Sequence, residues 1–161
     1  TTNTLRLFTA AGSREFDMNE FNSGDYMSAV RQKFEAETIS KVLYPSDNFA
    51  QGKELRLIQE YFLVACSIRD IVRQVDADGK SIESLPEYVA IQLNDTHPAL
   101  SVAELMRLLI DERDLNWQTA WDITQKTLAY TNHTLLPEAL ETAKAERKRQ
   151  CAILCENEAV A

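Results

Sequence analysis

The sequence of 161 residues predicts an α/β fold, because segments with strand-like and helix-like patterns alternate along it. Residues 88–93 are rich in β-formers and nearly all apolar, which is typical of a strand inside a sheet. Residues 53–75 carry apolar side chains every three or four positions, which is typical of an amphipathic helix. We therefore expect helices layered against a sheet, and the sequence contains no internal repeat.

The first third of the chain predicts a strand, a turn and a helix. Residues 5–9 alternate apolar and polar side chains, which predicts a short strand, and residues 12–15 predict a turn. Residues 21–25 offer capping side chains, so a helix is predicted over residues 26–43. Its middle, residues 31–37, is highly polar, so we expect much of this helix to face water or a partner.

A loop and a long helix are predicted next. Residues 44–52 predict the loop, because Pro45 and the Asx residues near it favour turns. The helix over residues 53–75 follows, and the polar residues 76–86 predict a surface loop before strand 88–93.

Further helices are predicted after that strand. Pro98 fits the first turn of a helix, with Thr96 or His97 near its cap. Asn116 opens another helix, and Leu136 looks like one more helix start. The positions expected to face inward in these helices are Val102, Leu105, Met106, Leu109, Ile110, Ala120, Trp121, Thr124 and Leu128.

Charge and composition exclude several classes of partner. The net charge of −8 repels nucleic acid and anionic lipid, so neither is expected to bind. No stretch approaches the roughly 20 apolar residues of a membrane span, and the N-terminus does not resemble a signal peptide. Because the sequence does not begin with Met, we expect it to belong to a longer chain.

The cysteines argue against a disulfide scaffold. They are three in number, Cys66, Cys151 and Cys155, without framework spacing. Cys66 follows an apolar run and is predicted to be a buried thiol. We therefore expect a reducing cytoplasm as the location.

Polar motifs follow two apolar segments. Residues 94–97 leave the predicted strand 88–93, and residues 132–134 repeat the arrangement. In open α/β folds ligands gather beyond the carboxyl ends of strands, so these motifs are candidate binding loops.

Other readings of these motifs stay open. Asp95 and Thr96 are equally well explained as helix caps. Asp95, His97 and His133 could be read as metal ligands, but their spacing matches no zinc pattern, so no metal site is predicted. Phosphate-loop, dinucleotide-binding and nucleophile-elbow motifs are all absent from the sequence. The residues alone predict an α/β domain with polar loops at strand ends.

Three segments of the sequence resemble the α-glucan phosphorylases, in family order and with family spacing. They are VLYPSDN at 42–48 with GKELRLIQEYF at 52–62, AIQLNDTHP at 90–98, and AYTNHTLLPEALE at 129–141. The resemblance covers residues 5–141, so we expect residues 1–141 to be a segment of the N-terminal domain of such an enzyme. Residues 142–161 do not continue it, and we expect a divergent tail, helical or disordered, with a solvated basic face.

The resemblance implies a glycosyltransferase that cleaves α-1,4-glucan ends with inorganic phosphate and releases glucose 1-phosphate. It implies two Rossmann-like domains facing a cleft, of which this chain is part of the first. It also implies pyridoxal phosphate, held by a lysine of the C-terminal domain that is absent from this chain. The helix over residues 26–43 resembles the subunit-contact helix of a homodimer.

Carried across residue by residue, the resemblance implies sugar-binding roles. His133 is similar to the histidine that hydrogen-bonds the glucosyl 6-hydroxyl, and Asn48 to the gate-loop asparagine that contacts the 2-hydroxyl. Asp47 matches the acidic residue of that gate loop. The remaining matches are polar residues that line the cleft near the sugar: Asp95, His97 and Glu141. No residue of this chain is assigned a catalytic role.

The sequence also departs from the family. Ala50 follows Phe49 where some members carry a second aromatic residue, which implies weaker stacking at the cleft entrance. Arg73 matches one arginine of the nucleotide-regulatory site of animal enzymes, but Gln74 stands where a second arginine would be. One arginine cannot grip a phosphate from two sides, so nucleotide activation is not expected. Residues 76–86 are also shorter than the animal regulatory loop.

The prediction is therefore part of a glucan phosphorylase that is inactive as an isolated chain. The alternative is a non-catalytic carbohydrate-binding or interaction module that retains the sugar loops. The length of the open reading frame separates the two, because only the first requires a downstream cofactor lysine.

Overall fold

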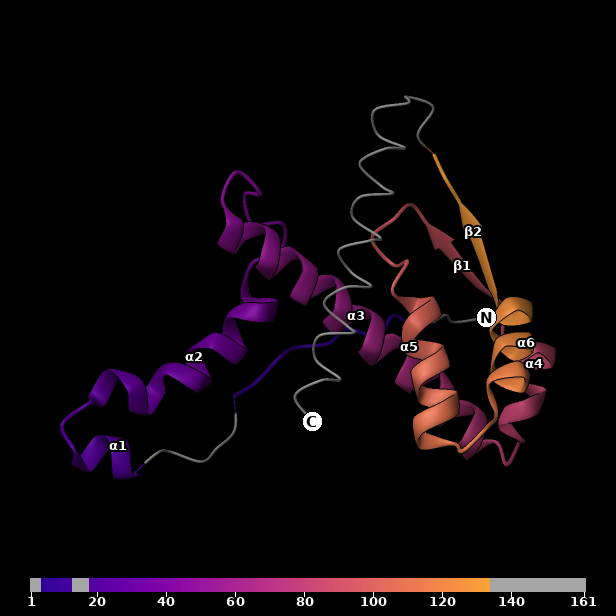
Figure 1. Cartoon of the computed structure of the whole chain (residues 1–161), viewed down its shortest axis with the longest axis horizontal. Coiled ribbons are helices and arrows are strands. Elements are labelled where there is room, and N and C mark those ends of the chain that lie inside the picture. The colour runs from indigo at the N-terminus through magenta and orange to yellow at the C-terminus, as the bar shows by residue number, and fades with distance from the viewer. Residues whose placement is uncertain (1–3, 13–17, 134–161) are drawn as a thin grey trace. The chain divides into compact units, whose positions relative to one another are not determined.

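The computed structural model describes residues 4–12 and 18–133 (Figure 1). The chain divides into two compact units, Thr1–Leu63 and Val64–Ala161. Helix α3 (Ala50–Ala77) contributes residues to both. We describe each unit by itself.

The first unit contains α1 (Met18–Asn22), α2 (Tyr26–Lys41) and the start of α3. Helix α2 confirms the helix predicted from residue 26, and it begins at a capped terminus. The Asp25 carboxylate accepts a hydrogen bond from the Ser28 backbone N–H at 3.0 Å. This bond lowers the pKa of Asp25, because it favours the charged form.

The predicted strand over residues 5–9 is wrong. Among the described residues no strand pairs with this segment, and both Leu5 and Leu7 are more than 80% exposed (83% and 84%). Its end lies instead beside the end of α2, where the backbone N–H of the next residue, Ala10, donates to the Ser40 Oγ at 2.9 Å. Alternation of side chains cannot by itself make a strand, since a strand also needs a neighbour for its backbone hydrogen bonds.

The sheet of the second unit has two parallel strands, β1 (Ile91–Asn94) and β2 (Leu128–Thr131), which run side by side in Figure 1. The register pairs Ile91 with Leu128 and Asn94 with Thr131. Strand β1 is shorter than the predicted 88–93, and Leu93 is its one buried residue. The expectation of a strand covered on both faces is therefore not met by the described residues.

The segment predicted as a surface loop, residues 76–86, is partly helical. It contains η1 (Ile82–Ser84), a 3₁₀ turn, and the start of α4 (Leu85–Tyr88). The Ser81 hydroxyl accepts from the Glu83 backbone N–H at 3.3 Å, and Leu85 is buried. Burial of Leu85 fixes this helical turn, although the sequence around it is polar.

After β1 come α5 (Ser101–Arg107), the π-helical turn η2 (Leu108–Glu112) and α6 (Trp117–Thr127). The prediction that Pro98 lies in the first turn of the helix is wrong, because α5 begins at Ser101 with Leu100 as its N-cap. The start of α6 is confirmed: the Asn116 side chain accepts from the Thr119 backbone N–H at 3.0 Å.

The core of the second unit is formed by the C-terminal part of α3, by β1 and by residues of α4, α5, η2 and α6. Its buried apolar side chains are Val64, Ile68, Val72, Val75, Leu85, Leu93, Leu100, Leu105, Met106, Leu108, Leu109, Ala120 and Ile123. The result is a helix-dominated unit with a small parallel sheet, which agrees with an α/β fold. None of the helices in residues 4–12 and 18–133 combines the length and apolar character needed to cross a membrane.

Candidate functional site

Two polar segments leave the sheet at the same edge. Because β1 and β2 are parallel and Asn94 pairs with Thr131, Asp95 and His133 both follow the carboxyl end of a strand. The Asp95 backbone N–H donates to the Thr131 carbonyl at 3.0 Å, which ties the two segments together directly beyond the sheet. The structure thus brings together the segments that carry Asp95 and His97 and the segment that carries His133.

Asp95 makes the turn at this edge. Its φ is 65°, in the left-handed region that Asp tolerates better than most residues. Its own carboxylate accepts from the Thr96 backbone N–H at 2.8 Å. Neither Asp95 nor Thr96 is the N-cap of α5, so the reading of these residues as helix caps is wrong. His97 and His133 are exposed, and Asp95 is half-buried, so all three are open to a ligand.

The predicted gate-loop residues Asp47 and Asn48 lie in the first unit, and both are exposed. Arg56 of α3 donates to the Asp47 carboxylate at 2.9 Å, and Gln59 of α3 donates to the Val42 carbonyl at 2.8 Å. The resemblance implies that Asn48 meets the same sugar as Asp95 and His133, and this stays a prediction.

The loop before α3 lies close against that helix where Ser46 meets Gly52. A Cβ atom built on Gly52 would lie 1.8 Å from the Ser46 carbonyl oxygen, far inside van der Waals contact. Only a residue without a side chain fits there. Sequence reasoning missed Gly52, Arg56 and Gln59, although their spacing of four and three places them on one face of a helix that directly follows the loop.

Replacing Gly52 by Ala should destabilise the protein by about 1–3 kcal/mol, because the new methyl group must displace backbone. This effect on stability is opposite to the usual one, since replacing Gly by Ala inside a helix normally stabilises it by about 1 kcal/mol. Urea unfolding would measure the change. Gly79→Ala is the matched control: Gly79 has a φ of 70° but nothing within 4 Å of an added Cβ, so only backbone strain of about 1 kcal/mol is expected. A stabilised Gly52→Ala variant would contradict the close contact.

Arg73, the predicted regulatory residue, is exposed and bound to an acidic neighbour. Its guanidinium donates to the Asp70 carboxylate at 2.7 Å. Gln74 donates to the same carboxylate at 2.8 Å. Both side chains therefore point toward Asp70. The absence of nucleotide activation stays a prediction.

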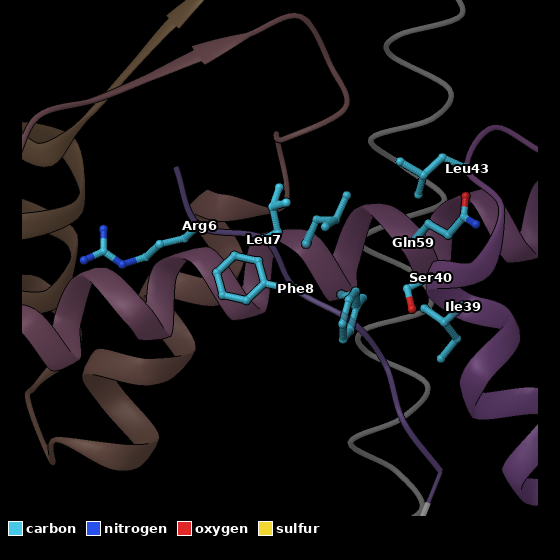
Figure 2. Close-up of a pocket in the computed structure, with 9 residues that line it drawn as sticks. Arg6, Leu7, Phe8, Ile39, Ser40, Leu43 and Gln59 are labelled. Carbon is cyan, nitrogen blue, oxygen red and sulfur yellow. The ribbon is translucent and has the colours of Figure 1, made fainter. Parts of the chain in front are cut away.

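A cavity of about 170 Å³ lies in the first unit, between the N-terminal segment, α2 and α3 (Figure 2). Its lining is mostly apolar, and in Figure 2 the Arg6 side chain extends away from the other labelled residues. The lining residues are Arg6, Leu7, Phe8, Ile39, Ser40, Leu43, Gln59, Phe62 and Leu63. None of the predicted sugar-binding residues is among them, so this cavity is not the candidate site.

Across residues 4–12 and 18–133, no three His, Cys, Asp or Glu side chains gather in a way that could hold a metal ion. Cys66 is half-buried rather than fully buried, and burial raises the pKa of its thiol. Glu141 and the predicted tail over residues 142–161 lie outside the described residues.

The parallel strands with polar segments at their common carboxyl edge form an α/β segment. In open α/β folds ligands gather at such edges. The sequence model of the carbohydrate phosphorylase family matches residues 1–152. The chain is 54% identical over 149 residues to the liver form of glycogen phosphorylase from Homo sapiens, a match that covers 88% of this chain and 18% of that protein. The chain therefore belongs to the carbohydrate phosphorylase family.

Other relatives agree. The chain is 54% identical over 149 residues to the brain form from Rattus norvegicus, with 88% of this chain and 18% of that protein covered. It is 53% identical over 141 residues to glycogen phosphorylase from Synechocystis, with 88% and 17% covered. The chain thus spans less than a fifth of the length of these relatives. The family match runs past Glu141 to residue 152, and the division of the chain at residue 141 stays a prediction.

Proposed function

We propose that this chain supplies glucan-binding loops to a phosphorylase, a glycosyltransferase that moves terminal α-1,4-glucosyl units to inorganic phosphate and releases glucose 1-phosphate. The observation that carries the proposal is the shared edge of β1 and β2, from which Asp95 and His133 both emerge. Identity of 54% to glycogen phosphorylases supports it. The complete protein has two Rossmann-like domains facing a cleft, and this chain is part of the first.

The proposed roles concern the sugar. His133 bonds the glucosyl 6-hydroxyl, and Asn48 contacts the 2-hydroxyl from the loop that also carries Asp47. Asp95, His97 and Glu141 line the cleft near the sugar. These imidazole, amide and carboxylate groups suit the hydroxyls of an uncharged glucan, whereas phosphate needs cationic partners from elsewhere in the protein.

Pyridoxal phosphate belongs to the rest of the complete enzyme in this proposal, and it would supply proton transfer through its phosphate. The lysines of the described residues do not fit its imine-forming role. Lys33, Lys41, Lys53 and Lys126 are exposed. Lys80 donates to Asp78 at 3.1 Å and lies 4.0 Å from the ring centre of Tyr88. We therefore place the cofactor lysine outside the described residues, in the C-terminal domain of the complete enzyme.

The partners follow from the same proposal. Helix α2 exposes large apolar side chains in its N-terminal part: Tyr26, Met27, Val30 and Phe34. Exposed apolar side chains on a polar helix suit contact with another protein surface, which supports a homodimer through residues 26–43. The remainder of the phosphorylase chain is the other partner, and the cytoplasm is the proposed location.

Replacing His133 by Ala in the full-length phosphorylase should lower kcat/KM for glucan about 10–100-fold, the cost of one well-placed hydrogen bond of about 1–3 kcal/mol. Steady-state assays of glucose 1-phosphate release would measure it. Gln118→Ala, an exposed change on α6 whose side chain bonds Asp122, is the control and should leave kcat/KM unchanged.

A second substrate sharpens this test. With a glucan end that lacks the 6-hydroxyl, the unaltered enzyme loses the same hydrogen bond, so the two enzymes should become nearly equal in kcat/KM. Unchanged kinetics of His133→Ala on ordinary glucan would show that His133 does not contact the sugar.

A further inference from the structure

The loop between α2 and α3 is held by one face of α3. Three residues of that face, Gly52, Arg56 and Gln59, contact the loop at three different points. Gln59 donates to the carbonyl of Val42 at 2.8 Å where the loop begins. Gly52 lies against the Ser46 carbonyl in its middle.

Arg56 contacts two side chains of the loop. Its guanidinium donates to the Asp47 carboxylate at 2.9 Å, and it lies 5.9 Å from the ring centre of Tyr44, within reach of a cation–π contact. Tyr44 has a φ of 57°, which an aromatic residue adopts only where its surroundings hold it. Arg56 thus contacts both the strained entry of the loop and the residue next to Asn48.

We propose that Arg56 is a positioning residue for Asn48: by holding Tyr44 and Asp47 it keeps the loop in the conformation in which Asn48 meets the glucan. This rests on the proposed sugar contact of Asn48. Arg56 itself touches no substrate. Its side chain is 31% exposed and that of Asp47 is 58% exposed, so solvent screens the pair and its effect on the loop is modest.

The test uses the full-length phosphorylase with Arg56→Met, which keeps an unbranched apolar stem and removes the charged guanidinium. Hydrogen exchange of the amides of residues 42–49 should become about twofold to fivefold faster, as expected for loss of one partly exposed ion pair. The kcat/KM for glucan should fall by a similar factor. Arg56→Lys keeps the charge but not the planar guanidinium, so it should restore part of both.

Arg113→Met is the matched control. Arg113 pairs with Asp76 in the second unit, and its side chain is 35% exposed, close to the value for Arg56. It should leave exchange in residues 42–49 and kcat/KM unchanged.

The outcomes distinguish the positioning role of Arg56 from the proposed sugar contact of Asn48. If exchange in residues 42–49 is unchanged in Arg56→Met, the positioning role is overturned, whatever happens to activity. If exchange accelerates and kcat/KM does not change, the loop does not serve the sugar, and the proposed role of Asn48 fails together with the functional part of this inference. Faster exchange with lower kcat/KM supports both.

Discussion

Replacing Arg107 by Met is expected to lower the free energy of unfolding of the second unit by about 2–3 kcal/mol. Glu104 has a side chain only 2% exposed, and Arg107 binds it with two hydrogen bonds, of 2.9 Å and 2.8 Å. The variant leaves this buried carboxylate without either bond. Breaking such a pair costs about 3–5 kcal/mol when both partners are buried, and less here because the Arg107 side chain is 35% exposed.

Urea unfolding followed by circular dichroism would measure this loss. A double variant, Glu104→Leu with Arg107→Met, removes the buried charge as well and should recover most of the stability. Arg113→Met is the control, since the partners of its ion pair are 35% and 38% exposed and such a pair contributes less than about 1 kcal/mol. An Arg107→Met protein as stable as the unaltered one would contradict the role of the buried pair.

The same variant should change the response to acid. Arg107 also donates to Glu112 at 2.9 Å, and Arg69 donates to Glu112 too. These bonds hold the pKa of Glu112 below its ordinary value of 4.5. A lowered pKa contributes stability that is present above pH 4.5 and is lost as pH falls through the lowered value. Arg107→Met should therefore make the free energy of unfolding fall less steeply as pH is lowered below 4.5.

The isolated chain is expected to release no glucose 1-phosphate from glucan and phosphate, even with pyridoxal phosphate added. Catalysis requires groups that stabilise the transition state better than the substrate, and they act from all sides of a closed site. This chain corresponds to 18% of the length of its relatives, and its proposed roles concern the sugar alone. An open site also admits water, which weakens each electrostatic contact.

The assay compares the purified chain with the full-length phosphorylase under the same conditions, and with denatured chain as the baseline. Release above that baseline, together with cofactor absorbance on the protein, would contradict the prediction. Glucan binding is measured in parallel. Tight binding by the isolated chain without turnover would favour the alternative of a carbohydrate-binding module.

The long helices could be predicted because their information is local. Asp25 and Asn116 cap helices in the structure as expected from the sequence. In α3, Ile68, Val72 and Val75 of the predicted apolar face are buried, whereas Ile58 is 40% exposed. Capping and apolar spacing act within one or two turns, so neighbouring residues are enough to specify them. The predicted ends of the helices were less accurate, since α3 begins at Ala50 rather than at residue 53.

The candidate site could be predicted as segments but not as an arrangement. The strings around Asn48, Asp95 and His133 were recognisable because family resemblance is carried by sequence. The hydrogen bond from Asp95 to Thr131 joins residues far apart in the chain, and no local pattern predicts it. Arg56 and Gly52 were missed for the same reason, since each matters through a contact with the loop rather than through its own neighbours.

By itself, the sequence determined the family, the helices and the identity of the polar motifs. Only the tertiary structure decided which apolar segments became strands. Residues 5–9 alternate well but pair with no strand among the described residues. Leu128 was predicted to lie in a helix, yet it begins the strand Leu128–Thr131, which pairs in parallel with Ile91–Asn94. A strand gains its hydrogen bonds from residues remote in sequence, whereas a helix gains them from residues four positions away. Hence the edge that carries Asp95 and His133 exists only once the chain has folded.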